Sequence, residues 1–191
     1  AAGLPQVPYT SAEANEITDP NSLPSLIEKL ETQINYPCFV KPANLGSSVG
    51  ISKAYNYKQL KSGLQLACTF DSRIVIEKNV RARELECAVL GKTQMRTSMV
   101  GEIKHNSDWY EYRTKYSSNS NQTLIPAPLS KEVAEEIQRL SLAACEAITA
   151  HSVARVDFFY SESKNEILIN EINTMPGFTA QSIYPLLWAA S

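Results

Sequence analysis

The segment ARVDFFYSESKNEILINEINTMPGFTAQS, from Ala154 to Ser182, carries the clearest structural pattern in the chain. Two of its runs, residues 155–160 and 167–172, are rich in Val, Ile, Leu, Phe and Tyr, and a polar segment lies between them. Short runs of this composition on either side of a polar loop predict a β-hairpin. We therefore expect this hairpin to be the framework of the candidate site.

The polar residues of the hairpin form a candidate metal site. If the hairpin turns near Lys164, Asp157 lies opposite Glu171. Arg155 then lies opposite Asn173, and strand alternation puts all four side chains on one face of the sheet. Facing carboxylates repel each other unless water or a cation separates them. Magnesium takes oxygen ligands from one or two carboxylates and leaves other positions to water and phosphate, so we expect this face to bind it.

A solvated hairpin face is the alternative to a metal site, and two features favour the site. The expected alternation places Phe159, Ile167 and Ile169 on the same face as the acids, and carboxylates on a partly apolar face need partners. The tight turn at 175–177, Met-Pro-Gly, predicts that backbone N–H groups and Ser182 return towards the same point.

Composition narrows the classes of function that the chain can have. Its 191 residues, 43% of them hydrophobic, predict one or two globular domains. A formal net charge of -2 gives no long-range attraction to nucleic acid or to an anionic membrane. The four cysteines form no CxxC pair, and no apolar run approaches the ~20 residues of a membrane span. We expect free thiols and a cytoplasmic protein.

A second candidate site lies in YPCFVKPANLGSSVG, residues 36–50. The segment reads as a short apolar strand that ends at Pro42 and is followed by a Gly/Ser loop, which suits phosphate binding. It is not a Walker A loop, because Lys41 precedes the glycines instead of following them. A plain turn is the alternative, but an ammonium group on an otherwise apolar strand favours an anion site.

The remaining patterns predict helices at 23–34, with Ser22 as its N-cap, at 53–70 and at 131–148. They predict strands at 74–78, 84–90, 94–103 and 109–116. Because strands do not alternate with helices, we expect an α+β fold of two lobes, residues 1–83 and 84–191. The residues that join the lobes read equally well as an interlobe hinge or as a surface hairpin. The polar stretch 115–123 predicts a surface loop that serves as a linker or a lid.

The order of these motifs resembles the ATP-grasp superfamily, and their wording is most similar to the D-alanine:D-alanine ligase family within it. The similarity covers nearly the whole chain from Cys38 onward and is carried by FVKPANLGSSVGIS, VIEK, RELECAVLG, TKYSS, ARVDFF and NEINTMPGFTAQS. It implies two α+β lobes with largely antiparallel sheets that enclose a nucleotide. It also implies that an N-terminal α/β domain and a C-terminal helical segment lie outside this chain.

The resemblance implies roles for individual residues. Phosphate and adenine-side contacts are implied for Lys41 and Lys78, adenine contacts for Glu77 and the backbone of Val80, and a ribose contact for Glu84. Ser47 and Ser48 would close over the phosphates, and Lys115 and Tyr116 would belong to the lid. Asp157, Glu171 and Asn173 would hold two Mg²⁺ ions, or Mn²⁺, while Arg155, Gly177, Ser182 and Ile183 would receive the reacting carboxyl and the second D-alanine.

The implied activity is ATP-dependent ligation of two D-alanines through an acyl phosphate, for peptidoglycan synthesis. The expected partners are ATP and D-alanine, without nucleic acid or membrane, and a homodimer of the intact protein is compatible with the pattern. The alternatives are another ATP-grasp carboxylate–amine ligase and a nucleotide-binding fragment that is inactive alone. The motifs GSSVG, TKY and NTMPGF favour D-alanine ligation over these alternatives. D-alanine:D-lactate ligases carry a histidine where this chain has Lys115-Tyr116, which favours dipeptide synthesis.

Overall fold

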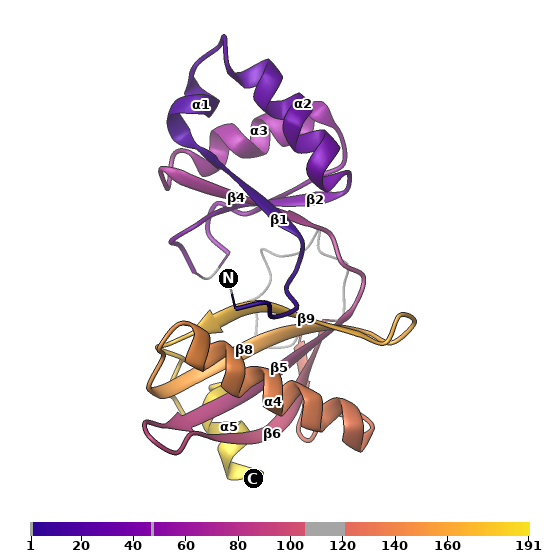
Figure 1. The fold of residues 1–191 in the computed structure, drawn as a ribbon, viewed down its shortest axis with the longest axis vertical. Coiled ribbons are helices and arrows are strands. Elements are labelled where there is room, and N and C mark those ends of the chain that lie inside the picture. Colours follow the sequence, from indigo (N-terminus) through magenta and orange to yellow (C-terminus); the bar gives the residue numbers. More distant parts are fainter. Residues whose placement is uncertain (1, 47, 106–120) are drawn as a thin grey trace. The chain divides into compact units, whose positions relative to one another are not determined.

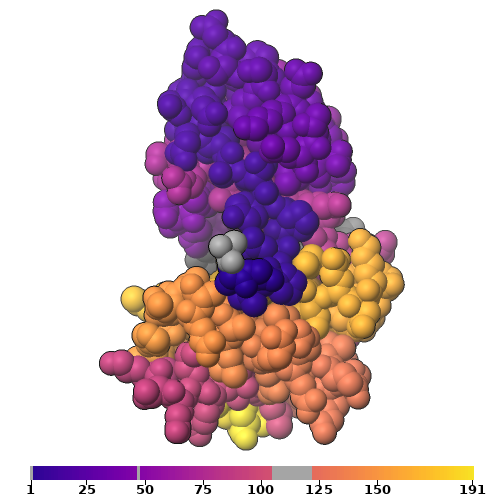
Figure 2. Space-filling view, viewed as in Figure 1, coloured from indigo at the N-terminus to yellow at the C-terminus, as the bar shows by residue number. Residues whose placement is uncertain are grey.

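The structure, a computed structural model, describes residues 2–46, 48–105 and 121–191. It divides into two compact units, which are residues 7–80 and residues 1–6 together with 81–191. The sequence predicts a division after residue 83 and places residues 1–6 in the first lobe, whereas here they belong with the second. Gln6 forms a parallel bridge with Ile169, and Figure 2 shows the first residues on the surface of this C-terminal unit.

The N-terminal unit is a four-stranded antiparallel sheet with the strand order β1-β4-β2-β3. Its helices pack on one side of the sheet (Figure 1). Its elements are β1 (Tyr9–Glu13), α1 (Ala14–Thr18), α2 (Leu23–Ile34), β2 (Cys38–Pro42), β3 (Ser52–Ala54), α3 (Tyr57–Ala67) and β4 (Arg73–Lys78).

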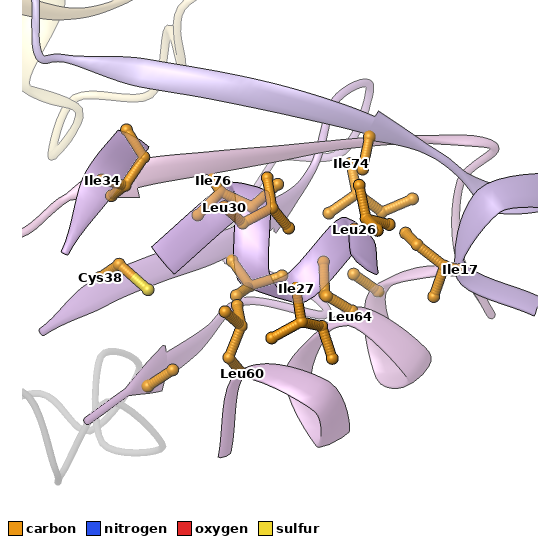
Figure 3. Packing of buried hydrophobic residues seen from close by; sticks show 14 of the residues in the cluster. Ile17, Leu26, Ile27, Leu30, Ile34, Cys38, Leu60, Leu64, Ile74 and Ile76 are labelled. Atoms are coloured by element: carbon orange, nitrogen blue, oxygen red, sulfur yellow. The ribbon is translucent and has the colours of Figure 1, made fainter. Parts of the chain in front are cut away.

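Strand alternation gives the N-terminal sheet one apolar face. Val40 and Ile76 are fully buried on it and pack with Ile27, Leu30 and Leu64 from α2 and α3 (Figure 3). Residues at odd positions of the same strands, which include Lys41 and Glu77, therefore lie on the face away from the helices.

Two local predictions in this unit need correction. A single helix over 53–70 is wrong, because Ser52–Ala54 pairs with β2 and α3 begins only at Tyr57. Asn56 causes this late start, since its side chain accepts a hydrogen bond from the N–H of Gln59 and caps the helix. Ser22 precedes α2 as expected, yet its hydroxyl donates to Asp19 and does not cap the helix.

The C-terminal unit is a five-stranded antiparallel sheet with the order β7-β6-β5-β8-β9. One helix covers each of its faces (Figure 1). Its elements are β5 (Arg83–Gly91), β6 (Arg96–His105), β7 (Asn121–Leu124), α4 (Lys131–Ala147), β8 (Ser152–Ser161), β9 (Glu166–Asn173) and α5 (Ile183–Ala189).

The two helices of this unit pack on opposite faces of the sheet. The apolar stripe of α4, with Ile137 and Leu140, joins Val156 and Phe158 in one buried cluster. On the other face Tyr184 and Leu187 of α5 pack on Ala88, a helix that the sequence reading did not predict. Because α5 covers only this part of the second face, the part that carries the polar ends of β5, β8 and β9 is available for a site.

The fold class is the predicted one, an α+β protein with two antiparallel sheets. The strands β4 and β5 belong to different sheets, so the segment between them connects the units and the surface-hairpin alternative is wrong. The expected strand at 109–116 lies outside the described residues, and β7 begins at Asn121 inside the expected loop. Within the described ranges, no helix is long and apolar enough to cross a membrane.

Candidate metal and nucleotide site

The predicted register of the β8–β9 hairpin is confirmed where the polar residues lie. Arg155 pairs with Asn173, and Asp157 pairs with Glu171. Cross-strand partners share one face of a sheet. The fold therefore brings these four side chains together on the face opposite α4.

The register changes by one residue immediately beyond Asp157. Phe158 pairs with Ile169 instead of Asn170, so Asn170 is the extra residue of a β-bulge. A shift of one residue exchanges the two faces of a strand. The predicted position of Ile167 and Ile169 beside the acids is therefore wrong, since both pack in the α4 core. Leu168, opposite Phe159, takes their place on the site face.

The four polar side chains form one connected group. Arg155 donates from Nε to Asp157 Oδ1 and from Nη2 to Asp157 Oδ2, each at 2.7 Å. Asn173 Nδ2 lies 3.1 Å from Asp157 Oδ2 and 3.1 Å from Glu171 Oε1. One amide group thus bridges both carboxylates, which places three oxygen-bearing side chains around a single point.

A third carboxylate, Glu86, belongs to the same group and was missed from the sequence. It lies on β5 directly opposite Asp157, and its Oε2 is 3.1 Å from Arg155 Nε. The side chains of Glu86 and Asp157 are only 12% and 13% exposed. The alternation of RELECAVLG could have placed Glu86 on this face, but only after β5 was known to pair with β8.

Burial and charge act against each other at this group. Burial raises the pKa of Asp157 well above its usual range against the lowering effect of the Arg155 hydrogen bonds, and Glu86 and Glu171 raise it further. Burial alone would lower the pKa of Arg155, but its hydrogen bonds to Asp157 and the nearby carboxylates raise it. The site therefore favours additional positive charge.

The donor set of this group fits a hard cation. Among the described residues no three His, Cys, Asp or Glu side chains are grouped to hold a metal by themselves. A cation on Asp157 and Glu171 would therefore also use the amide oxygen of Asn173, which a flip of its amide would present, and ligands from outside the chain. Mg²⁺ typically takes only a few of its ligands from the protein and leaves its other positions to water and phosphate.

In the N-terminal unit the structure brings Lys41 and Glu77 together as an ion pair on the face away from the helices. Lys53, which the sequence reading placed in a helix, lies on this face too, with its ammonium 5.2 Å from the centre of the Phe39 ring. Lys78 pairs with Cys38, so alternation puts it on the opposite face, at an exposed strand end. Lys41 and Lys53 therefore lie on one face of the sheet, and Lys78 lies on the other.

The remaining candidates occupy three further places. Val80 is half-buried at the end of the N-terminal unit, and Glu84 lies opposite Phe159 on the site face of β5. Ser48, in the Gly/Ser loop, has a φ of 57°. Ser47, Lys115 and Tyr116 lie outside the described residues.

The loop after Asn173 brings Gly177 and Ser182 against each other. A Cβ on Gly177 would lie 2.9 Å from Ser182 Oγ, so a larger residue would displace this hydroxyl. Ser182 Oγ accepts a hydrogen bond from the Thr179 N–H at 3.1 Å. Ile183 is half-buried at the start of α5, while Phe178 is exposed and its ring centroid lies 5.2 Å from that of Tyr184.

Comparison with known proteins gives a consistent result. The family model described as "D-ala D-ala ligase C-terminus" matches residues 1–191. The chain is 62% identical over 191 residues to a D-alanine--D-alanine ligase of Prochlorococcus marinus, covering 100% of the chain and 54% of that protein. It is 52% identical over 191 residues to the D-alanine--D-alanine ligase of Synechococcus sp. (strain CC9605), covering 55% of it.

Two solved structures have the same fold. The VanG D-Ala:D-Ser ligase from Enterococcus faecalis matches with a TM-score of 0.85 and 31% identity, over 99% of this chain and 53% of that one. The D-alanine-D-alanine ligase from Coxiella burnetii matches with a TM-score of 0.78 and 32% identity, over 99% of this chain and 48% of that one. The chain spans about half the length of the curated relatives that it matches.

Proposed function

Because the chain belongs to the D-ala D-ala ligase C-terminus family, we propose that it is the nucleotide- and metal-binding part of an ATP-dependent ligase. The proposed product is D-alanyl-D-alanine for peptidoglycan synthesis, made in the cytoplasm. The observation that carries the proposal is the convergence of Arg155, Asp157, Glu171 and Asn173 on one sheet face. The 62% identity to a D-alanine--D-alanine ligase supports the choice of substrate.

In this proposal Asp157, Glu171 and Asn173 hold two magnesium ions, or manganese in their place. When bound, these ions offset negative charge on the transferring phosphoryl group. Lys41 lies beside Glu77 and would exchange this partner for a nucleotide phosphate. The Gly/Ser loop with Ser47 and Ser48 would cover the phosphates, while Lys78, Val80, Glu84 and Lys115 would contact the rest of the nucleotide.

The proposed reaction needs no nucleophile from the protein. The carboxylate of the first D-alanine attacks the γ-phosphorus of ATP, and ADP leaves, so that D-alanyl phosphate forms. The amine of the second D-alanine then attacks the acyl carbon, loses a proton and displaces inorganic phosphate. Arg155 would stabilise the oxyanion of this tetrahedral intermediate together with backbone N–H groups near Gly177. Tyr116 would exclude water from the acyl phosphate, and Ser182 and Ile183 would bind the second D-alanine.

The acceptor is the part of the proposal that needs the most direct test. One of the matching structures is a D-Ala:D-Ser ligase, which shares the fold at 31% identity. Two D-alanine--D-alanine ligases match at 62% and 52% over the whole chain. We therefore assign D-alanine as the acceptor. The alternative is an ATP-grasp ligase of the same mechanism with another amine or hydroxyl acceptor.

The test uses the protein extended to the length of its curated relatives, supplied with ATP, Mg²⁺ and D-alanine. ADP release and dipeptide are measured together, with D-serine and D-lactate as competing acceptors. We expect ADP and D-alanyl-D-alanine in equal amounts, and a loss of about 100-fold in turnover for Asp157→Asn. Glu166→Gln, at the far end of the same hairpin, removes the same charge and serves as the control. A product made mainly with D-serine or D-lactate, or ADP without dipeptide, would contradict the proposal.

A further inference from the structure

Arg155 occupies the oxygens of Asp157 that a metal ion would need. Its Nε and Nη2 bond to Oδ1 and Oδ2 of Asp157 at 2.7 Å, a bidentate arrangement that uses both carboxylate oxygens. Asn173 Nδ2 also lies 3.1 Å from Oδ2. A cation and the guanidinium therefore compete for one carboxylate, and Arg155 must give up at least one of its two bonds when a cation binds.

A guanidinium that leaves a carboxylate inside a largely buried site needs another partner. Arg155 is only 21% exposed, and an uncompensated charge at such a depth is costly. Glu86 provides a carboxylate at the right place, because it faces Asp157 across the β5–β8 pair and its Oε2 already lies 3.1 Å from Arg155 Nε. A change of side-chain torsion is therefore enough to move the guanidinium from one carboxylate to the other.

We propose that Glu86 is a positioning residue, which holds the Arg155 guanidinium when a magnesium ion takes the oxygens of Asp157. This inference rests on the proposed function, because it assumes that a metal binds at Asp157. In both states Arg155 keeps one carboxylate partner, so the exchange leaves no buried charge unpaired. The exchange also keeps the guanidinium at the site and frees its N–H donors from Asp157. Those donors can then bind a reacting carboxyl group.

Two other roles for Glu86 make different predictions. As a direct metal ligand, it would weaken magnesium binding when neutralised whether or not Arg155 is present. As a purely structural residue, it would change the stability of the fold without a specific effect on the metal. Only the positioning role makes the effect of Glu86 on the metal depend on Arg155, and a double-mutant cycle measures this dependence.

The experiment measures how binding of a non-hydrolysable ATP analogue depends on Mg²⁺ concentration in the wild-type chain, Glu86→Gln, Arg155→Met and the double variant. We expect Glu86→Gln to raise the Mg²⁺ concentration for half-maximal binding by about tenfold, a typical coupling between charged neighbours. In the Arg155→Met background the same change should have an effect of about twofold or less. Glu166→Gln is the control for loss of one negative charge, and thermal unfolding in the absence of metal verifies that each variant is folded.

Each outcome separates this inference from the proposed function. If the wild-type chain binds the analogue without any magnesium dependence, the metal assignment fails and this inference fails with it. If the wild type depends on magnesium and Glu86→Gln does not differ from it, only the role of Glu86 is wrong. An equal loss in both backgrounds would likewise leave the metal site in place and make Glu86 a ligand instead of a positioning residue.

Discussion

At the scale of single residues, Asp157 has an environment that an exposed carboxylate would not have. It is nearly buried, it accepts two hydrogen bonds from Arg155, and two other carboxylates face it. Each of these features follows from its place on β8, an inner strand between β5 and β9. A divalent cation would satisfy this group better than a second guanidinium, because it can contact several carboxylates at once.

We expect Asp157→Asn, Glu171→Gln and Asn173→Ala each to weaken magnesium-dependent nucleotide binding, since each removes an oxygen ligand or its charge. The loss should be about tenfold or more for Asp157, which is largely buried, and smaller for Glu171, which is exposed. Nucleotide titrations with and without magnesium measure this directly. Unchanged metal dependence in all three variants would remove the metal site from this hairpin.

The cysteines allow a second prediction at the residue scale. Burial raises the pKa of Cys38, Cys87 and Cys145 to about 11, and each of the three is buried. Thiol reagents attack the thiolate and must also reach it. At pH 8 the folded chain should therefore react fastest at Cys68, which is partly exposed although burial raises its pKa as well. A colorimetric thiol assay should detect one fast thiol in the folded chain and four after unfolding in urea.

The same shift has a consequence for stability. In the unfolded chain these thiols ionise near pH 9, whereas in the folded chain they remain protonated until about 11. Since the folded state binds protons more tightly, the free energy of unfolding should fall as the pH rises through this window. In the thiol assay, three fast thiols in the folded chain at pH 8 would show that the two hydrophobic cores open more readily than the burial of the cysteines indicates.

At the scale of elements, the β8–β9 hairpin shows what the sequence can and cannot predict. The prediction from a turn centred near Lys164 is correct for Asp157 and Glu171, because it matches the register on the far side of the bulge from the turn. It fails at Ile167 and Ile169, because a bulge at Asn170 inserts one unpaired residue and nothing in the composition of EILINEIN marks it. Glu86 was missed for a related reason, since the order of strands in a sheet is a long-range property.

Arg83 connects four elements of the C-terminal unit and gives a prediction about stability. It lies at the start of β5 and donates to Glu102 on β6 at 2.9 and 2.8 Å, to Glu162 in the β8–β9 loop and to the carbonyl of Pro128 before α4. Glu102 is 3% exposed. Arg83→Met would leave this buried carboxylate without its counter-charge, so we expect a loss of about 3–5 kcal/mol in the free energy of unfolding.

The matched control for Arg83→Met is Glu162→Gln, which removes the exposed partner of the same guanidinium. The Glu162 side chain is 64% exposed, and exposed ion pairs contribute about 1 kcal/mol or less. Urea unfolding of both variants measures the difference. Equal losses in the two variants would mean that the buried Arg83–Glu102 pair is no more important to the fold than the exposed one.

At the scale of the whole molecule, the sequence predicts two α+β units with antiparallel sheets because strand and helix patterns follow each other without βαβ alternation. The place of residues 1–6 is different. Their backbone joins β9 through Gln6 and through the Ile169 N–H, which donates to the Pro5 carbonyl at 2.9 Å. A short segment of this kind has no periodicity that points to a distant partner. The seven residues of α5 are likewise too few to show a convincing helical period.

The last prediction concerns what the chain does by itself. We expect the 191-residue chain to bind ATP with magnesium yet to form little D-alanyl-D-alanine, while a form extended to the length of the curated relatives forms it efficiently. The chain contains the candidate nucleotide groups from Lys41 to Asn173, but the family resemblance assigns part of the first D-alanine site to a preceding domain. Without that surface the reacting carboxylate is not held in line with the γ-phosphate. The effective molarity forfeited in this way can reach ~10⁵ M or more.

Two measurements on both forms test this prediction. One is magnesium-dependent ATP binding, and the other is dipeptide formation under saturating ATP and D-alanine. ATP affinities of the two forms should agree within about threefold, or about 0.7 kcal/mol, because the candidate nucleotide groups lie on the short chain. Their dipeptide rates should differ by orders of magnitude. Asp157→Asn in the same short chain is the control for binding at the proposed site. Equal dipeptide rates would show that residues 1–191 hold both D-alanines without help, and that the groups which orient the first one must be sought on this chain, beginning with Arg155 and the loop around Gly177.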